Sequence, residues 1–148
     1  MAEVKNEMKF EFISKSANEG FARATISAFV AQLDPTISEL ADIKTAVSEA
    51  VTNCIVHAYD NRLGIIYISV RIYDSGQVVI KIRDKGCGIE NINKAMEPLY
   101  TTGGTERAGL GFAVMQSFMD NIKVTSKQGK GTTVTLTKNI IPRVVKNG

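Results

Sequence analysis

Residues 65–83 have the sequence IIYISVRIYDSGQVVIKIR, and this stretch decides the fold class. Two runs rich in β-branched residues, 65–73 and 78–83, stand on either side of Asp-Ser-Gly at 74–76. Such runs with a short polar turn between them are typical of two antiparallel strands. The stretch therefore predicts a β-hairpin.

Further strands and helices are expected on both sides of this hairpin. In the segment 36–59, Thr36 and Glu39 match a capping box, which marks the start of a helix. The order of strand, two helices, hairpin, loop, helix and hairpin predicts an α+β fold, a two-layer α/β sandwich with helices on one face of the sheet. The other expected strands are 8–13, 122–126 and 132–137; the expected helices are 18–33, 36–59, the short piece 92–96, and 110–119; and 98–108 is expected to be a loop.

The length and the apolar pattern favour a single-domain protein without a membrane-spanning helix. At 148 residues the chain has the length of one domain, 1–148. No apolar run approaches the roughly 18–20 residues of a membrane-spanning helix, and the N-terminus lacks the pattern of a secretory signal. A cytoplasmic protein without a membrane segment is expected. Two cysteines outside any C-x-x-C pattern and one histidine leave too few ligands for a zinc site.

Charge and glycine are unevenly distributed along the chain. Residues 1–60 carry 5 basic and 9 acidic side chains, whereas 61–148 carry 13 basic and 6 acidic ones. Eight of the 12 glycines lie within 86–131. This distribution suits a phosphate-bearing ligand, but a solvated basic face with turn glycines explains it as well, and composition alone favours the latter.

The helix expected at 36–59 holds Glu49, Asn53 and His57 at intervals of four residues, so all three lie on one side of a regular helix. A carboxylate and a carboxamide together suit a hard cation such as Mg²⁺. Alternatively, Glu49 is a general base and Asn53 alone binds the metal. An ordinary solvated helix face remains the third interpretation.

Asp84, Gly86 and Gly88 directly follow the second strand of the hairpin. Glycines at alternate positions permit positive φ and a close approach of the backbone to a ligand. An aspartate at a strand end can accept a hydrogen bond from an amino group such as that of adenine. A simple turn leaving the hairpin is the competing interpretation.

Two more glycine motifs follow. Gly109 and Gly111 stand at the expected start of the helix 110–119, where free amides and the helix dipole favour phosphate, and Arg107 just before them can bind a terminal phosphate. Residues 131–133, Gly-Thr-Thr, begin the last expected strand, where a threonine hydroxyl can reach a purine directly or through water. Each of these signals alone is also explained by ordinary turns and strands.

Taken together and in order, the motifs resemble those of the GHKL superfamily of ATP-binding proteins. Within it, the chain is most similar to the small serine-kinase branch, and within that branch to the anti-sigma F factors of spore-forming bacteria. The residues that carry the resemblance are Glu49-x-x-x-Asn53, Asp84-x-Gly86-x-Gly88, Gly109-x-Gly111 and Gly131-Thr132-Thr133 for the superfamily; 49–53, His57, 98–102 and 109–112 for the branch; and 21–23 with 29–36 for the anti-sigma F factors.

The resemblance implies a GHKL (Bergerat-type) fold with a mainly antiparallel, mixed sheet, and it implies a role for each matching residue. Glu49 would be the base on a serine hydroxyl, and Asn53 would ligate Mg²⁺. Asp84 would hold the adenine amino group, with Gly88 giving room beside it and Thr133 assisting.

The remaining matches concern the phosphates, the lid and the partners. Gly86 belongs to the adenine motif, Gly109 and Gly111 would shape the phosphate loop, and Arg107 would reach the γ-phosphate as part of the catalytic machinery. Residues 101–108 would form a mobile lid, although 103–105 depart from the expected lid pattern. Arg23 is a candidate contact with a partner.

By resemblance, the chain is expected to be a homodimeric, ATP- and Mg²⁺-dependent protein serine kinase. It would sequester a sporulation sigma factor and phosphorylate a serine of an anti-anti-sigma factor. A related general-stress anti-sigma kinase and a non-catalytic, ATP-gated binding module are the alternatives. Direct nucleic-acid binding is not expected, although the basic second half leaves it open.

Overall fold

The computed structural model describes residues 2–89 and 105–141, in which five strands and three α-helices form two layers. In chain order the elements are β1 (Val4–Ile13), α1 (Ala17–Val30), the 3₁₀ turn η1 (Ala31–Leu33), α2 (Ile37–Asn53), the π-helical turn η2 (Cys54–Ala58), β2 (Ile65–Tyr73), β3 (Gln77–Arg83), α4 (Thr105–Phe118), β4 (Asn121–Lys127) and β5 (Gly131–Asn139). The expected two-layer α+β fold is confirmed.

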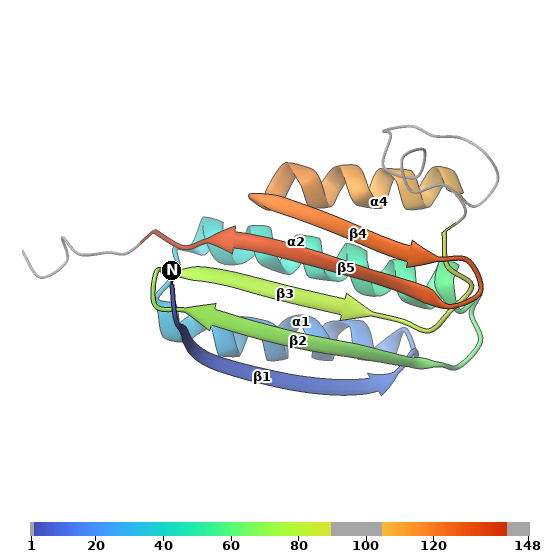
Figure 1. Cartoon of the computed structure of the whole chain (residues 1–148), viewed down its shortest axis with the longest axis horizontal. Helices are drawn as coiled ribbons and strands as arrows, with labels where there is room; N and C mark the ends of the chain where they lie inside the picture. The colour runs from blue at the N-terminus through green and yellow to red at the C-terminus, as the bar shows by residue number, and fades with distance from the viewer. Residues whose placement is uncertain (1, 90–104, 142–148) are drawn as a thin grey trace, which may run out of the picture.

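The sheet has the strand order β1-β2-β3-β5-β4 (Figure 1). The hairpin expected at 65–83 is present as β2 and β3, paired from Tyr67 with Arg83 to Ile72 with Val78. All four neighbouring pairs of the described strands are antiparallel, so the mixed character that was expected is absent from this part of the chain. The physical reason is that β5 takes its direction from its hairpin with β4, and this direction sets it antiparallel to β3.

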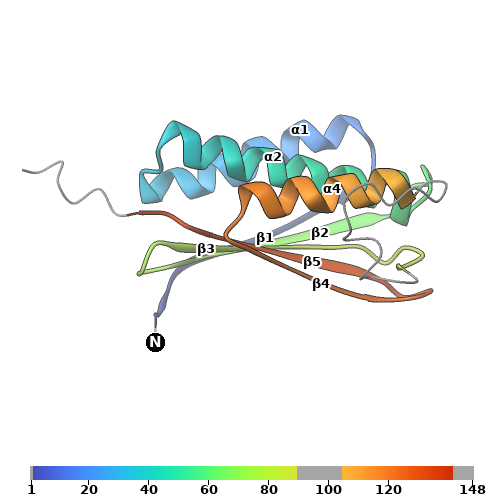
Figure 2. The ribbon, with the colours of Figure 1, turned by 90° about the horizontal axis from the view of Figure 1, so that it is seen from above.

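The three α-helices cover one face of the sheet, as Figure 2 shows edge-on. Along β3 the alternate residues Val78, Ile80 and Ile82 are fully buried beneath them, whereas Lys81 and Arg83 are exposed on the other face. Each such buried aliphatic side chain stabilises the fold by about 1.5–3 kcal/mol. The alternation therefore explains why the helices pack on this face and leave the other uncovered.

The capping box predicted from the sequence begins α2. The Thr36 hydroxyl accepts a hydrogen bond from the Glu39 amide at 3.0 Å, and the Glu39 carboxylate accepts one from the Thr36 amide at 2.8 Å. These bonds satisfy two amides that have no partner inside the helix. The start of α2 is thereby fixed.

The prediction of a single regular helix that ends near residue 59 is corrected by the structure. Regular α-helix ends at Asn53, and η2 follows as a π-helical turn in which the Tyr59 amide donates to the Cys54 carbonyl at 3.0 Å. Apolar spacing does not distinguish the two forms, because a π-turn inserts its wider step without interrupting the apolar face. Such turns are frequent at functional sites.

The helix expected at 110–119 also begins earlier than predicted. α4 starts at Thr105, so Gly109 and Gly111 lie inside the helix rather than at its start, and 105–108 are helical rather than loop. Glycine lowers helix propensity, which explains why the sequence pattern placed the boundary at these residues. The expectations for 92–96 and 98–104 lie outside the described residues. No helix in the described ranges is long and apolar enough to cross a membrane.

Candidate functional site

Glu49, Asn53 and Gly111 meet where α2 packs against α4. A Cβ atom placed on Gly111 would lie 3.0 Å from Nδ2 and 3.2 Å from Oδ1 of Asn53, and 3.3 Å from Oε2 of Glu49. These separations are tighter than ordinary van der Waals contact. The structure therefore brings together three residues that the sequence singled out, with glycine at the point of closest approach.

Among the described residues, one polar atom of the Asn53 side chain finds no partner. Its Nδ2 is buried and has no hydrogen-bond partner among the described residues. Leaving a buried donor unsatisfied costs about 1–3 kcal/mol. Native structures accept such a cost mainly at sites that a ligand, ion or water completes.

The donor set around Asn53 fits Mg²⁺ only together with a phosphate ligand. Asn53 offers an amide oxygen, and Mg²⁺ commonly takes one or two protein oxygens, several waters and substrate phosphates. Residues 2–89 and 105–141 contain no cluster of three or more His, Cys, Asp or Glu residues that could hold a metal ion by themselves. Asn53 is thus suited to complete a metal–phosphate group rather than to bind a bare ion.

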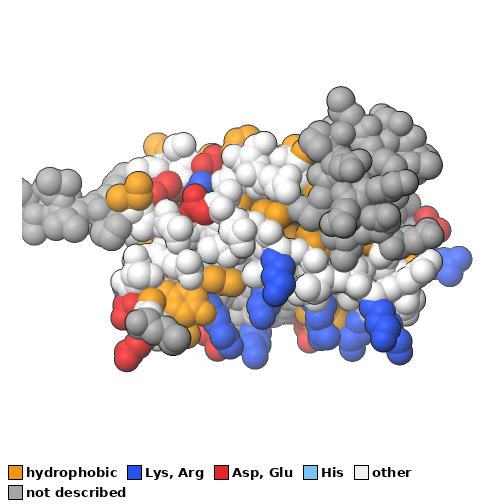
Figure 3. All heavy atoms as spheres, turned by 45° about the horizontal axis from the view of Figure 1, so that its top comes forward, with side chains coloured by type: hydrophobic (Ala, Val, Ile, Leu, Met, Phe, Trp, Pro, Cys, Tyr) orange, Lys and Arg blue, Asp and Glu red, His pale blue; other side chains and the backbone are white. Residues whose placement is uncertain are grey.

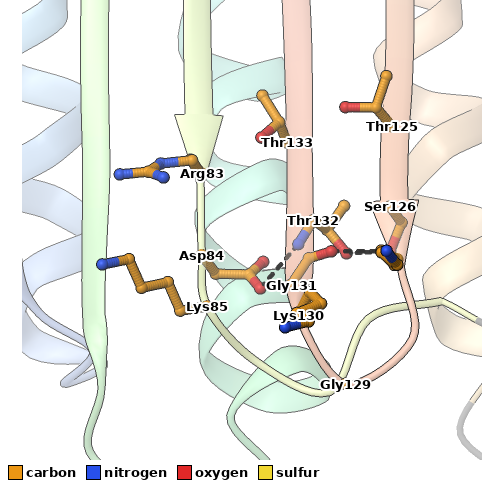
Figure 4. A pocket seen from close by; sticks show the side chains of 11 residues that line it. Arg83, Asp84, Lys85, Thr125, Ser126, Gly129, Lys130, Gly131, Thr132 and Thr133 are labelled. Carbon is orange, nitrogen blue, oxygen red and sulfur yellow. Dashed lines mark hydrogen bonds between the residues drawn. The ribbon is translucent and has the colours of Figure 1, made fainter.

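Asp84, directly after β3, has one carboxylate oxygen fully engaged and the other partly free. Its Oδ1 accepts a hydrogen bond from the Gly86 amide at 2.9 Å. The same oxygen accepts one from the Thr132 amide at 3.2 Å, which Figure 4 shows. Its Oδ2 accepts a hydrogen bond from the Cys54 thiol at 3.5 Å. The side chain is only 5% exposed. Oδ2 therefore keeps acceptor capacity for an amino group.

Burial is the largest influence on the pKa values of Asp84 and Cys54. Burial raises the pKa of Asp84, and the hydrogen bonds from Gly86, Cys54 and Thr132 oppose that rise. Burial, together with the nearby Asp84 charge, raises the pKa of the Cys54 thiol well above its usual value, so the thiol stays protonated and can donate. No pattern in the sequence pointed to the contact of Cys54 with Asp84.

The two glycines after Asp84 approach the chain's own backbone. A Cβ on Gly86 would lie 2.3 Å from the Ala58 carbonyl oxygen of η2, and a Cβ on Gly88, whose φ is +78°, would lie 2.4 Å from the Lys127 carbonyl oxygen. Between them, Cys87 donates from its amide to Ala58 and accepts from Gly129. The close approach expected toward a ligand is made, in this structure, to η2 and the β4–β5 turn.

The threonine that hydrogen-bonds to Asp84 is Thr132, the neighbour of Thr133. Thr132 is 7% exposed, its amide donates to Asp84, and its hydroxyl shares a hydrogen bond of 2.8 Å with that of Ser126. Because side chains alternate along a strand, Thr133 points to the opposite face of the sheet. There it lies directly opposite Arg83 of β3 in the pairing of β3 with β5. The role expected of Thr133 therefore stays a prediction.

Four other expected residues lie on α1, η2 and α4. The backbones of Arg107 and Gly109 belong to α4, and the roles expected of them stay predictions. Arg23 lies exposed on α1, where its Nε is 3.7 Å from the Glu19 carboxylate. His57 lies in η2, so the regular spacing of Glu49, Asn53 and His57 on one α-helix ends at Asn53.

The chain is similar to known proteins over most of its length. Residues 14–138 match the family model of the histidine kinase-like ATPase domain. The chain is 59% identical to the anti-sigma F factor of Caldanaerobacter subterraneus subsp. tengcongensis, over 93% of this chain and 96% of the relative. The chain belongs to the anti-sigma F factor family. It is also 53% identical to the anti-sigma F factor of Clostridium acetobutylicum, over 91% of this chain and 94% of that protein.

Solved structures agree with this family at the level of the fold. The crystal structure of the RsbU and RsbW domains of Rv1364c from Mycobacterium tuberculosis matches 92% of this chain and 32% of that chain, with a TM-score of 0.66 and 20% identity. The histidine kinase domain of the Erythrobacter litoralis EL346 blue-light activated histidine kinase matches 82% of this chain and 61% of that one, with a TM-score of 0.55 and 20% identity. This member of the anti-sigma F factor family therefore has a kinase-like ATPase fold.

Proposed function

We propose that this chain is an ATP-dependent protein serine kinase that also acts as an anti-sigma factor. One observation carries the proposal: Glu49 and Asn53 stand together against Gly111, with the Asn53 amide nitrogen buried and without a partner in the described residues. A carboxylate beside a buried amide with unused hydrogen-bonding capacity is suited to phosphoryl transfer, because that reaction needs positioning and charge stabilisation. Membership of the anti-sigma F factor family supports the regulatory half of the proposal.

The proposed reaction is the transfer of the γ-phosphoryl group of ATP to a serine hydroxyl, with Glu49 as the base. Glu49 accepts the proton of a serine hydroxyl on the substrate protein. The serine oxygen forms a bond to the γ-phosphorus of ATP while the bond from that phosphorus to the bridging oxygen breaks, and ADP leaves with the electron pair. A positioned base of this kind contributes about 10²–10⁴-fold to the rate.

The nucleotide would be held at both ends. Oδ2 of Asp84 would accept a hydrogen bond from the adenine amino group, supported by the acceptor capacity that Cys54 leaves on that oxygen. Asn53 would bind Mg²⁺ through its amide oxygen, and the ion would neutralise phosphate charge. Gly109 and Gly111 would border the phosphates, and Arg107 would contact the γ-phosphate.

The partners are proposed by analogy with the relatives. The chain would bind a sporulation sigma factor and use an anti-anti-sigma factor as its phosphorylation substrate, working as a homodimer in the cytoplasm. Arg23 contacts Glu19 at 3.7 Å and donates a hydrogen bond to the Ser48 hydroxyl at 3.4 Å, but it is exposed on α1 and is the proposed partner contact. The family match over residues 14–138 supports one ATP-binding kinase domain spanning 1–148.

Phosphate transfer to a candidate anti-anti-sigma factor tests the proposal. The full chain is incubated with Mg²⁺, ATP labelled at the γ-phosphate and that protein, and the product is analysed for phosphoserine. The matched control is the same substrate with its acceptor serine replaced by alanine. We expect label on the unmodified substrate alone. Nucleotide binding without any transfer would instead identify a non-catalytic, ATP-gated module.

A further inference from the structure

The uncovered face of the sheet carries a basic groove. Two hollows border it, one of about 570 Å³ at the ends of β3, β4 and β5 and one of about 460 Å³ across β1, β2 and β3. Arg83 and Thr133 line both hollows, which are therefore neighbours. We define the basic groove by Thr133 and the six cations that line the hollows, Lys9, Lys81, Arg83, Lys85, Lys127 and Lys130. All six cationic residues are exposed.

The charge of this groove is not neutralised from within. The ion pairs among the described residues join Arg23 to Glu19, Arg71 to Glu7 and Lys138 to Asp42, and none of them involves a groove cation. Figure 3 shows Lys and Arg side chains gathered along the border of the molecule where the sheet lies.

Acidic residues contribute little to the lining. Two of the residues that line the hollows are acidic, Glu11 on β1 and Asp84. Hydrogen bonds from Gly86 and Thr132 hold the Asp84 carboxylate, which is buried. Glu11 is therefore the single exposed carboxylate on the lining, and the groove presents a net positive surface.

Part of the groove is held in a fixed arrangement. The Arg83 guanidinium lies 4.6 Å and the Lys85 ammonium 5.0 Å from the centroid of the Tyr67 ring (Figure 4 shows both cations beside the pocket). Cation–π contacts of this kind favour one placement of otherwise mobile side chains. Preorganised cations lose less conformational entropy when an anion binds.

We propose that the basic groove binds an extended acidic segment of a protein partner, on the face of the sheet opposite Glu49 and Asn53. Ammonium, guanidinium and hydroxyl groups, as on Lys81, Arg83 and Thr133, are the donors that carboxylates require. Single-stranded nucleic acids, by contrast, bind sheet faces through exposed aromatic rings on which bases stack. Here the groove's Tyr67 ring has two cations over it, so that platform is occupied.

Fluorescence anisotropy with a labelled oligoglutamate peptide tests this inference. A triple variant, Lys81→Gln, Arg83→Gln and Lys127→Gln, is compared with a control of equal charge loss outside the groove, Lys5→Gln, Lys44→Gln and Arg62→Gln, whose residues are also exposed. We expect the groove variant to bind about tenfold more weakly or worse, because three charge contacts are lost, and the control to retain most of the affinity. Binding should weaken as salt is raised to about 0.15 M.

Four results would overturn the inference. These are the absence of oligoglutamate binding at low salt, equal losses in the two triple variants, tighter binding of an oligothymidylate of equal charge than of oligoglutamate, and a loss of ATP affinity in the groove variant. The last measurement separates this face from the nucleotide site, since none of the three substituted residues belongs to that site. The free energy of unfolding of both variants is measured alongside and should match the wild type.

Discussion

At the scale of single residues, Asp84 shows how the fold prepares an acceptor. Backbone amides of Gly86 and Thr132 hold one oxygen, and the Cys54 thiol contacts the other without exhausting it. The carboxylate is thus oriented before any ligand arrives. Orientation of this kind reduces the entropy lost on binding.

Replacing Asp84→Asn should weaken ATP binding. If the asparagine oxygen keeps the bonds to the two backbone amides, its NH₂ group faces Cys54 and the adenine amino group, so a donor meets a donor. A hydrogen bond to a charged group contributes about 1.5–3 kcal/mol, so the dissociation constant should rise about 10- to 100-fold. Isothermal titration calorimetry measures this, with Asp74→Asn in the exposed β2–β3 turn as the control. Unchanged ATP affinity in Asp84→Asn would refute the adenine assignment.

The raised pKa of Asp84 also predicts a pH dependence of stability. In the unfolded chain the carboxyl has its ordinary pKa of 3.8, and burial raises it in the folded state. Between these two values the folded state binds more protons, so this group's contribution to stability falls as pH rises through the window. The free energy of unfolding of the wild type, relative to Asp84→Asn, should fall from pH 3.8 upward and level off above the raised pKa. Urea unfolding at a series of pH values measures it, and a difference that grows with pH contradicts the raised pKa.

The residues of the candidate site could be proposed from the sequence, but some of their contacts could not. Glu49, Asn53 and Asp84 were found because polar residues at fixed offsets beside apolar runs are visible in a sequence. The contact of Thr132 with Asp84 had no signal in the sequence, because the face to which a strand residue points depends on register, and a shift of one residue reverses it. The contact of Cys54 with Asp84 spans 30 positions and has no local signal.

At the scale of elements, the boundaries with local chemistry were predicted and those set by packing were not. The capping box at Thr36 is complete within four residues, and the β2–β3 turn within three. The π-turn η2 is held instead by distant groups: the Tyr59 hydroxyl donates to the Ile65 carbonyl at 2.6 Å and accepts from the Lys85 amide at 2.7 Å. α4 begins five residues early, since its packing on α2 offsets the weak helix propensity of glycine.

Removing the cap of α2 should lower stability without altering the site. Thr36→Ala loses the side-chain acceptor for the Glu39 amide, which typically costs about 1 kcal/mol. Equilibrium urea unfolding measures the loss, and Thr45→Ala, on the exposed side of α2, is the matched control expected to change stability by less than about 0.5 kcal/mol. Equal stability of Thr36→Ala and the wild type would contradict a role for the cap. ATP affinity should be unchanged in both variants.

At the scale of the whole molecule, the two faces of one sheet differ in what covers them. One face packs under α1, α2 and α4 and positions the candidate nucleotide site, while the other carries the basic groove. The uneven charge seen in the sequence is partly explained by this division, since Lys81, Arg83 and Lys127 belong to the second half of the chain. Composition alone could not distinguish a solvated face from a groove, because a groove depends on strands distant in sequence.

The proposed single domain predicts one cooperative unfolding transition. The apolar residues of the helices and of the sheet form one core cluster, so neither layer should unfold alone. Far-UV circular dichroism and tyrosine fluorescence should therefore give coincident thermal curves. Two separate transitions would contradict a single domain.

ATP at about 100 times its dissociation constant should stabilise the fold by about 2.7 kcal/mol.

The central claim, that Glu49 is the base of an ATP-dependent phosphoryl transfer, is tested most directly by Glu49→Gln in single-turnover kinetics with saturating ATP. We predict that the transfer rate falls by about 10²–10⁴-fold. The dissociation constant for ATP, measured by calorimetry on the same protein, should stay within about threefold of the wild type. Glu11→Gln, an exposed carboxylate on the other face, should retain the full rate. Full activity of Glu49→Gln would contradict the account.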